Sequence, residues 1–309
     1  MILRCCLKGG CTLKRRQYKN PVGVSKYTGL LLILPFIAGF IMFTLYPFVC
    51  SFFLGMTDYH STGKPEFTGL ENYLTMFRSE SFRKALWVTL KYAAILVPLK
   101  LLVSLLTAVL LNLEIKGIGF FRTAFYIPSI LGANLAIVIM WQYLFTAKGL
   151  VNQFLELFGA SPVSWYGDPK AAMYIIILLR LWEFGSTMVI FLAALRDIPK
   201  ELHDAARVDG CGCIRSFFCI TLPQIKSIIF INLILQTISA LQEFNAPYMI
   251  TGGGPLKSTY TVGMLIYDEM FRYGETGYAN AVSWILFTLI ALTVSLMYLV
   301  TGRKGRDRL

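Results

Sequence analysis

Residues 197–223 carry the sequence DIPKELHDAARVDGCGCIRSFFCITLP, a polar and charge-rich stretch that separates two long apolar runs. Pro199 suits the first position of a helix, and Glu201 falls in the first turn, where the helix dipole favours a carboxylate. Gly210 suits the left-handed conformation that ends many helices. These residues predict a helix over residues 200–209.

A second short helix is expected over residues 214–222, because Pro223 cannot extend a helix from within and the chain should turn there. The first helix carries the small pair Ala205 and Ala206 on one side and charged side chains on the other. We interpret residues 197–223 as a helix-turn-helix platform on which another protein docks.

The composition of the whole chain is that of a polytopic membrane protein. Of its 309 residues, 56% are hydrophobic and 15% are charged, and the mean hydropathy is +0.62. A soluble domain has more charge and less apolar surface. The net charge of +12 does not indicate nucleic-acid binding, because the Lys and Arg residues flank the apolar runs and do not gather on one soluble face.

The apolar runs are each about 22 to 27 residues long, which is the length needed to cross a bilayer as a helix. They predict an all-α membrane protein with six transmembrane helices in a permease domain that covers residues 27–302. Pro35 and Pro47 are expected to kink the first helix. The runs are residues 27–53, 85–111, 120–144, 171–195, 228–250 and 279–300.

An even number of spans places both chain ends on the same side of the membrane, and the excess of Lys and Arg makes that side cytoplasmic. The basic tail of residues 1–26 has no apolar core, so it is not interpreted as a signal peptide. The segments expected in the cytoplasm are residues 1–26, 112–121, 197–223 and 303–309, and those expected outside are residues 55–84, 145–170 and 251–278.

Neither the cysteines nor the histidines predict a catalytic or metal site. Cys5, Cys6 and Cys11 lie in the basic tail without a second ligand pair at a zinc-like spacing, so we favour unpaired thiols over a metal cluster. With only His60 and His203, a histidine-based triad is excluded. No Gly-x4-Gly-Lys-Ser/Thr loop occurs, so the chain is not expected to bind ATP, to bind any cofactor or to act as an enzyme.

The platform resembles the EAA loop of ABC importer membrane subunits, which reads Glu-Ala-Ala, three residues, Gly, and later Ile-x-Leu-Pro. Two positions depart from this pattern: Asp204 replaces the usual Glu, and Cys211 replaces a usual Ala. Both keep the charge or the small size, so we expect the docking role to survive. The residues that the resemblance assigns to coupling with an ATPase are Asp204, Ala205, Ala206, Arg207, Asp209, Gly210, Leu222 and Pro223.

Further segments resemble the carbohydrate-importing branch of this family, in particular the permeases that precede a sister permease in sugar and glycerol-phosphate importers. Each segment alone is weak, but their order along the chain is specific. They are Phe67-x-Gly69-Leu70-x-Asn72-Tyr73, Phe121-Arg122 before Ile127-Pro128, Thr251-Gly252-Gly253-Gly254-Pro255, and Gly277-Tyr278-Ala279-x-Ala281-x-Ser283.

The resemblance implies a permease in a prokaryotic cytoplasmic membrane that forms a heterodimer with a sister permease. It also implies two cytoplasmic ATPase subunits, which use ATP and Mg, and an extracellular solute-binding protein. A monosaccharide, an oligosaccharide and glycerol 3-phosphate all stay open as the solute. The alternative from another class is a stand-alone ion-coupled secondary transporter, which would need an internal repeat and carboxylates at mid-membrane.

Five ionisable residues fall within the apolar runs, where an unpaired charge costs about 3 kcal/mol or more. Arg180 and Glu183 are three residues apart on one helical face, and we favour an ion pair between them over contact with a substrate. Lys100 is expected to face protein or to extend to the membrane surface. The set is Lys91, Lys100, Arg180, Glu183 and Glu243.

Polar side chains in the fifth run form a candidate path for a solute. A sugar needs many hydrogen-bonding groups and an aromatic plane, which neighbouring aromatic residues would supply. The other interpretation is that the same polar residues join helices by hydrogen bonds, and the sequence leaves both open. The candidate residues are Gln236, Ser239, Gln242, Glu243, Tyr248 and Trp284.

Overall fold

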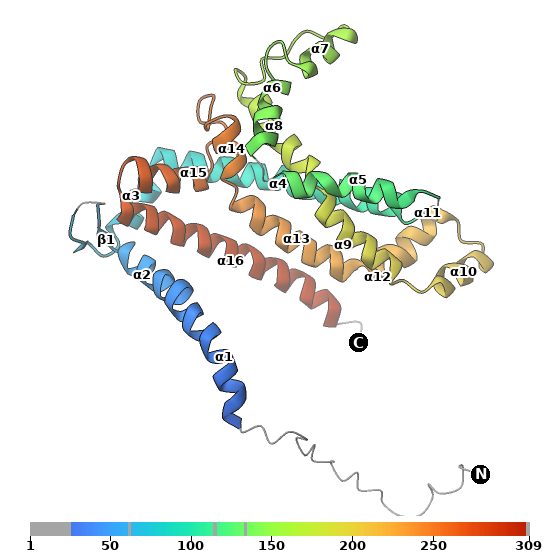
Figure 1. Cartoon of the computed structure of the whole chain (residues 1–309), viewed down its shortest axis with the longest axis horizontal. Coiled ribbons are helices and arrows are strands. Elements are labelled where there is room, and N and C mark those ends of the chain that lie inside the picture. The colour runs from blue at the N-terminus through green and yellow to red at the C-terminus, as the bar shows by residue number, and fades with distance from the viewer. Residues whose placement is uncertain (1–25, 61–62, 114–115, 133–134, 307–309) are drawn as a thin grey trace, which may run out of the picture. The chain divides into compact units, whose positions relative to one another are not determined.

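The computed structural model describes residues 26–60, 63–113, 116–132 and 135–306, and these are mostly helical (Figure 1). The tail cysteines Cys5, Cys6 and Cys11 lie outside the described residues. The chain divides into two compact units, Met1–Ser51 and Phe52–Leu309.

In the first unit, α1 (Lys26–Phe40) continues through a π-helical stretch (Ile41–Leu45) into α2 (Tyr46–Leu54). Pro47 has no N–H to donate to the carbonyl four residues before it, which favours a wider helical turn at this point. The large apolar side chains of this segment are exposed, and Leu32 reaches 77%. The segment therefore offers its apolar surface to lipid or to another chain.

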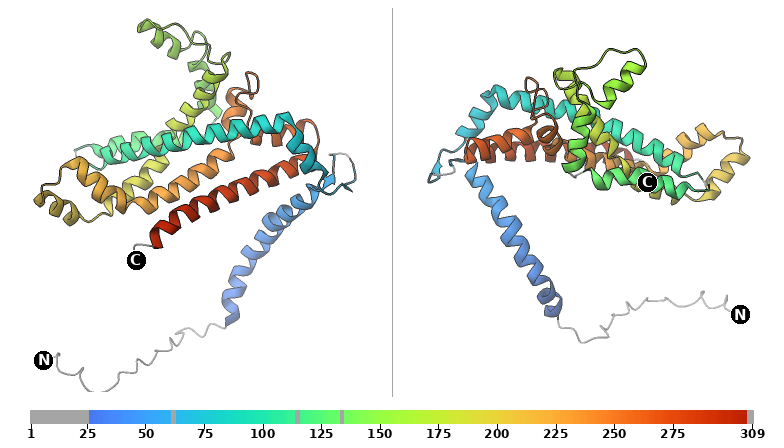
Figure 2. Two further views of the ribbon diagram at one scale, coloured as in Figure 1. Left: turned by 180° about the vertical axis from the view of Figure 1, so that it is seen from behind. Right: turned by 45° about the horizontal axis from the view of Figure 1, so that its top comes forward.

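The second unit is organised around α4 (Glu80–Leu111), whose first turn is capped by Ser79 Oγ accepting from Phe82 N at 3.3 Å. This helix packs against α8 (Pro169–Trp182), α9 (Gly185–Arg196) and α13 (Lys226–Leu241), and α13 also packs against α16 (Thr276–Arg306) (Figures 1 and 2). The 32 residues of α4 exceed the length needed to cross a membrane.

Smaller elements connect these helices. Two-residue strands, β1 (Thr57–Asp58) and β2 (Glu66–Phe67), pair antiparallel. The other elements are α3 (Glu71–Arg78), α7 (Leu150–Leu157), α10 (Lys200–Val208), α11 (Cys213–Ser216), the π-helical Phe217–Thr221, α12 (Leu222–Gln224), α14 (Asn245–Ile250), α15 (Val262–Tyr267) and the π-helical Asp268–Arg272.

Three helices of the described chain are long and apolar enough to cross a membrane: Leu31–Leu54, α4 and Thr276–Val300. Three further candidates are bent pairs of helices. The bend is 101° between α5 (Ile118–Leu131) and Ala136–Leu144 of α6 (Leu135–Leu144), 43° between α8 and α9, and 67° between Cys213–Gln224 and α13. The protein is thus an all-α membrane protein with three to six candidate spans, and the number six stays a prediction.

The second unit has two apolar cores. The first core combines the N-terminal half of α4, up to Val97, with α8 up to Leu179 and with α3, α6 and α13 to α16. The second core combines Ala108 and Leu111 of α4 with Met188 and its neighbours on α9. Between the two cores, α4 carries Lys100 and Ser104 among apolar residues, and the α8–α9 pair carries Arg180 and Glu183.

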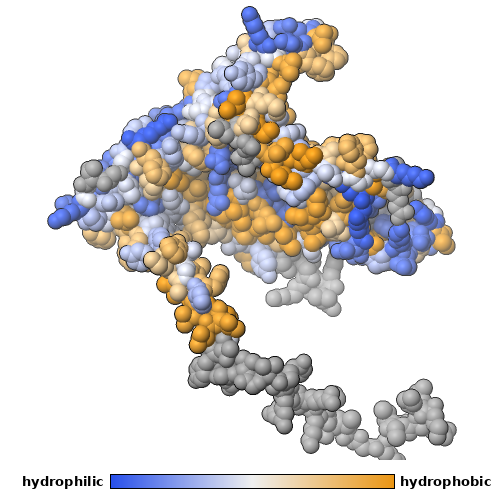
Figure 3. Space-filling view, viewed as in Figure 1, coloured by the Kyte–Doolittle hydropathy of each residue, from blue (hydrophilic) through white to orange (hydrophobic). Residues whose placement is uncertain are grey.

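The C-terminal end of α16 lies at the same end of this unit as α10, whereas α3 and β1 lie at the opposite end (Figures 1 and 2). Hydrophilic side chains gather over α10, and hydrophobic side chains cover much of the helical surface between the two ends (Figure 3). The platform therefore projects from one end of an apolar helical body.

Candidate functional site

A cluster of buried charges lies between the two apolar cores. Arg180 near the end of α8 donates from Nε and Nη2 to the two carboxylate oxygens of Glu243, each at 2.8 Å. Its Nη1 donates to both oxygens of Glu183, at 2.8 and 3.1 Å. The predicted Arg180–Glu183 ion pair is confirmed, and Glu243, 63 residues along the chain from Arg180, joins it.

Lys100 completes this charge cluster from α4. Lys100 is 9% exposed and lies near Glu183, Arg180 and Glu243, although no ion pair within 4.0 Å joins it to either carboxylate. Two cations and two carboxylates give a net charge of zero, which offsets the cost of burying each charge. Of the two expectations for Lys100, the structure supports the one in which it faces protein, whereas Lys91 is exposed on the surface of α4.

The charge cluster lies where α8 breaks into α9, and hydroxyls from other helices satisfy the backbone there. Ser129 Oγ of α5 donates to Glu183 O at 3.1 Å and accepts from Ser186 N at 2.9 Å. Ser104 Oγ of α4 donates to Lys100 O at 2.6 Å and lies 3.3 Å from Phe184 O. The break is therefore stabilised by the fold, since the backbone groups that lose their helical partners there bond to side chains of other helices.

Gly132 at the end of α5 approaches the same break. A Cβ atom at this position would overlap the Glu183 carboxylate, so only glycine fits. Charge and hydrophobic periodicity in the sequence do not predict that Gly132 and Ser129 contribute to this site. The signal for them is the Gly132-Ala-Asn sequence, which interrupts the third apolar run.

A second break, between α13 and α14, is fixed by Glu243. Its Oε1 also accepts from Ala246 N at 3.1 Å, so the carboxylate caps the start of α14. Thr261 Oγ1 donates to the Glu243 carbonyl at 2.9 Å. One carboxylate thus binds the cation of α8 and shapes the fifth apolar run at the same time.

The polar residues of the fifth run divide into two groups. Gln236 Nε2 donates to Thr187 Oγ1 of α9 at 2.9 Å, and Glu243 is 7% exposed in its ion pair, so both join helices. Ser239 and Gln242 are exposed, and so is Asn245 at the start of α14. Of these residues, only the second group presents exposed polar side chains, and their contact with a solute stays a prediction.

Aromatic rings gather beside the break at the start of α14. Phe244 stacks on Tyr248 with ring centroids 5.0 Å apart, and Tyr267 lies 5.1 Å from Phe244 and 5.0 Å from Tyr248. Trp284, which was expected near these rings, instead packs against Phe52 at 4.9 Å. The predicted solute-path residues therefore do not form one surface.

The loop between α14 and α16 is tied together by polar contacts. Tyr260 donates its hydroxyl to Asp268 Oδ2 at 2.8 Å, and Arg272 pairs with Asp268 at 3.1 Å. Burial and the hydrogen bond to Asp268 raise the pKa of the Tyr260 hydroxyl, which therefore stays protonated as a donor at neutral pH.

Asp58, His60 and Glu275 offer three potential metal-ligand atoms that lie within 4.8 Å of one another. Each ring nitrogen of His60 already faces a carboxylate at 3.2 Å, and the side chains are 40% to 59% exposed. The group links the loop after α2 to the start of α16, and it does not form a preorganised metal centre.

The platform begins with α10, which confirms the predicted helix to within one residue. Pro199 is the N-cap residue, one position earlier than expected, and Glu201 lies in the first turn as expected. Gly210 has φ of +73°, with its N–H bonded to Arg207 O at 3.0 Å. Cys211 N donates to Ala206 O at 2.8 Å, which completes a Schellman end.

The second part of the platform runs helically from Cys213 to Gln224, through the π-helical stretch, and breaks at Ile225. Pro223 lies inside this continuous helical run, directly after the π-helical stretch, whose wider turn accommodates the missing N–H. The chain turns at Ile225, two residues later than expected. His203 Nδ1 lies 3.1 Å from Ser216 Oγ, which joins α10 to α11.

The outer surface of the platform is exposed and partly apolar. Val208 is 89% exposed, Ile214 77% and Phe218 60%. Ala206 is buried, whereas the other residues assigned to coupling, Asp204, Ala205, Arg207, Asp209, Gly210 and Pro223, are exposed, and Leu222 is half-buried. Asp204 and Arg207 form an exposed ion pair at 3.6 Å. Exposed apolar side chains among charges are typical of a protein interface.

A helical membrane protein with one projecting platform and no catalytic constellation in its described residues is typical of a transport subunit. Residues 77–305 match the family described as the binding-protein-dependent transport system inner membrane component, and the chain belongs to this family. It is accordingly a multi-pass, non-catalytic permease component of the cytoplasmic membrane. The stand-alone secondary transporter is thereby set aside.

Similar proteins cover most of the chain. It is 40% identical over 274 residues to the probable ABC transporter permease protein YesP of Bacillus subtilis, covering 87% of this chain and 89% of that one. It is 32% identical over 286 residues to the trehalose/maltose transport system permease protein MalF of Thermococcus litoralis, covering 90% and 95%. The fold is similar to a chain of a bacterial ABC transporter for alginate import, with a TM-score of 0.77, 22% identity and coverage of 90% and 96%.

Proposed function

We propose that this chain is one membrane subunit of an ATP-driven importer that takes up a carbohydrate delivered by an external binding protein. The observation that carries the proposal is the exposed platform helix α10, which ends in a Schellman motif and presents the apolar side chain of Val208 at 89% exposure. The proposed arrangement has six spans, both termini in the cytoplasm, and residues 197–223 as the cytoplasmic coupling loop.

In the proposed mechanism, α10 lies in a groove of a cytoplasmic ATPase subunit and moves with it as a rigid body. The exposed Ala205 permits close approach, and Asp204 and Arg207 form ion pairs at the rim. Gly210 sets the angle between α10 and the next helix. ATP and Mg bind the two ATPase subunits, and the chain itself contributes movement without chemistry. A sister permease completes the pore.

Two observations support a carbohydrate as the solute: the names of the relatives and the exposed polar groups beside α14. The named relatives include permeases for trehalose or maltose in Thermococcus litoralis and for lactose in Rhizobium radiobacter. In this chain, Ser239, Gln242 and Asn245 supply exposed hydroxyl and amide groups. The stacked pair Phe244 and Tyr248 lies at the same break and offers aromatic planes to the apolar face of a sugar ring. We place the solute path here.

The test is photo-crosslinking from position 208 in the chain co-expressed with its ATPase subunit. A benzophenone amino acid replaces Val208, the most exposed apolar side chain of α10. The expected product contains this chain and a protein that carries a Gly-x4-Gly-Lys-Ser/Thr loop, and its yield changes when ATP and vanadate are added.

The matched control places the same crosslinker at Tyr298 of α16, which is 66% exposed and lies within the sixth apolar run. It should give no ATPase product. If position 208 labels only lipid, or labels a protein outside the cell, the coupling function of the platform is refuted.

A further inference from the structure

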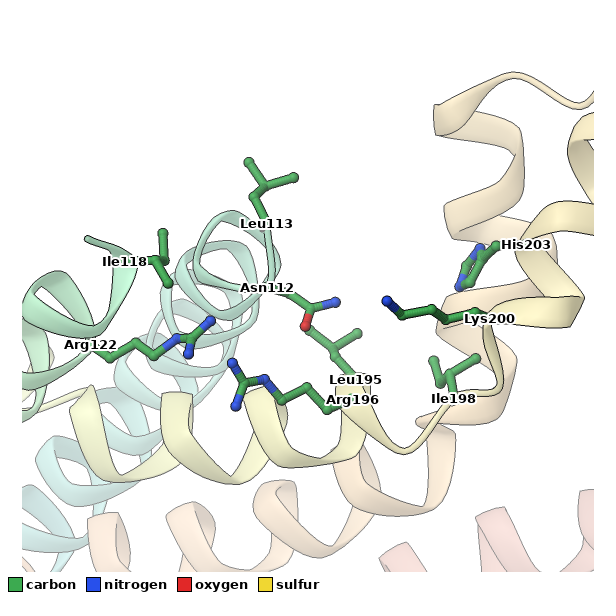
Figure 4. Close-up of a pocket in the computed structure, with 9 residues that line it drawn as sticks. All are labelled: Asn112, Leu113, Ile118, Arg122, Leu195, Arg196, Ile198, Lys200 and His203. Atoms are coloured by element: carbon green, nitrogen blue, oxygen red, sulfur yellow. The ribbon is translucent and has the colours of Figure 1, made fainter. Parts of the chain in front are cut away.

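A basic pocket of about 360 Å³ lies between the ends of the helices and the platform (Figure 4). Four separate segments build it: the end of α4, the start of α5, the end of α9 and the start of α10. Its lining residues are Asn112, Leu113, Ile118, Arg122, Leu195, Arg196, Ile198, Lys200 and His203.

The charge of the pocket is one-sided. The guanidinium groups of Arg122 and Arg196 point toward one another, and the Lys200 ammonium group points toward Asn112 (Figure 4). No Asp or Glu lines the pocket, so its lining carries three positive charges. Asp197 and Glu201 directly follow Arg196 and Lys200 in sequence but are not among the lining residues. Glu114, two residues after Asn112, lies outside the described residues, and counting it against the lining leaves a charge of +2.

Arg122 is held in place by the fold. Its Nε and Nη2 donate to the carbonyl of Leu111 at 3.2 and 2.7 Å, so the guanidinium group caps the end of α4. These two bonds fix the plane of the group before any ligand binds, and a fixed guanidinium fork favours an oxyanion such as a phosphate.

An apolar groove of about 630 Å³ continues from the basic pocket. The two share Asn112, Leu113, Leu195, Ile198 and His203. The rest of the groove lining is mainly apolar and comes from α4 and from the second half of the platform; it includes Leu106, Val109, Ile214, Phe217 and Phe218. A cationic chamber that opens into an apolar groove matches an amphiphile with an anionic head.

The position of the basic pocket at the helix ends also favours a lipid as its ligand. The pocket lies at the ends of α4, α5 and α9, on the platform end of the apolar body, where basic residues meet lipid head groups on the cytoplasmic side. We propose that the basic pocket binds the phosphodiester of an anionic membrane phospholipid and that the adjoining groove holds part of its acyl chain. The lipid then bridges α5 and α9 to α10, and it steadies the platform.

The experiment is native mass spectrometry of the purified chain, alone and in complex with its partners. The protein is equilibrated with phosphatidylglycerol and phosphatidylcholine that have identical acyl chains. Wild-type protein should retain phosphatidylglycerol over phosphatidylcholine by about tenfold or more. Arg196→Gln should reduce this preference about fivefold, the effect expected for one basic residue beside an anionic membrane.

Two variants control this result. Arg196→Lys keeps the charge and should keep the preference. Arg215→Gln removes an exposed charge of α11 that lines neither the pocket nor the groove, and it should leave the preference unchanged. Thermal midpoints of all variants, measured in the same detergent, verify that they are folded.

Three outcomes would overturn the proposal. The first is equal retention of the two lipids by wild-type protein. The second is displacement of phosphatidylglycerol by millimolar inorganic phosphate, which would identify a site for a free anion. The third is loss of the preference in the complex with the ATPase, which would show that the partner fills the pocket.

Discussion

The balance of the charge cluster makes a quantitative prediction about stability. Lys100, Arg180, Glu183 and Glu243 sum to zero charge, and the two carboxylates and Lys100 are each no more than 12% exposed. Glu243→Gln keeps the shape but leaves a net charge of +1 among buried groups. Removing one partner of a buried ion pair costs about 3 to 5 kcal/mol. We therefore expect Glu243→Gln to lower the free energy of unfolding by about 3 kcal/mol or more.

A second substitution distinguishes charge balance from the loss of particular hydrogen bonds. Lys100→Met alone should also destabilise the protein, because it leaves a net charge of −1. In the double variant the charge returns to zero, with Arg180 still paired to Glu183. The double variant should then lose less stability than the two single variants lose together. The difference, which is the coupling energy, should be about 2 kcal/mol, within the range measured for residues in one network.

The assay is thermal unfolding of the purified protein in detergent, in which each kcal/mol shifts the midpoint by roughly 2 °C or more for a chain of this size. Each single variant should then melt about 6 °C or more below wild type. Lys84→Met is the matched control, because Lys84 lies on the same helix, outside the apolar run, and is exposed; it should change stability by about 0.5 kcal/mol at most. Additive effects of Lys100→Met and Glu243→Gln would refute the charge-balance argument.

Three pairs of substitutions probe the helix break, the platform and the fifth run. Gly132→Ala should cost about 1 to 3 kcal/mol in thermal unfolding because its Cβ meets the Glu183 carboxylate, whereas Gly119→Ala, on the same helix with open space around it, should cost nothing. Gly210→Ala should lower the free energy of unfolding by only about 1 to 2 kcal/mol, because of the positive φ at this position, since nothing lies within 4 Å of the new atom. Gly210→Pro should in addition uncouple uptake from ATP hydrolysis in reconstituted vesicles. Normal uptake by this variant would contradict the lever mechanism. Gln242→Ala should change uptake kinetics without a change in stability, whereas Gln236→Ala should lower stability by about 0.6 kcal/mol through the lost bond to Thr187; the reverse pattern would exchange the two roles.

Local chemistry is what the sequence predicts well. Gly210 identifies the end of α10 because only glycine adopts a positive φ at low cost, and the residue type is visible without the fold. The Arg180–Glu183 pair follows from helical spacing alone. The lengths of the apolar runs likewise indicate helices because bilayer thickness sets the requirement.

Long-range pairing is what the sequence does not reveal. Glu243 reaches Arg180 from another helix, and hydropathy alone does not distinguish this partner from an exposed carboxylate that contacts a solute. The α8–α9 and α13–α14 breaks were also missed, because their backbone groups are satisfied by Ser129, Ser104 and Thr261 from distant segments. The basic pocket was missed for the same reason, since its cations come from α5, α9 and α10.

The positions of the breaks relate the charge cluster to the platform. The platform is attached to the second core at both of its ends, through Leu195 of α9 and through Ile225. A displacement of α10 is therefore transmitted first to that core, which is close-packed and resists deformation. Between it and the first core lie the α8–α9 break and the charge cluster, which touches α14 through Glu243. Polar contacts with defined geometry at helix breaks permit discrete rearrangement more readily than continuous helices do, so we place the hinge of the permease at this layer.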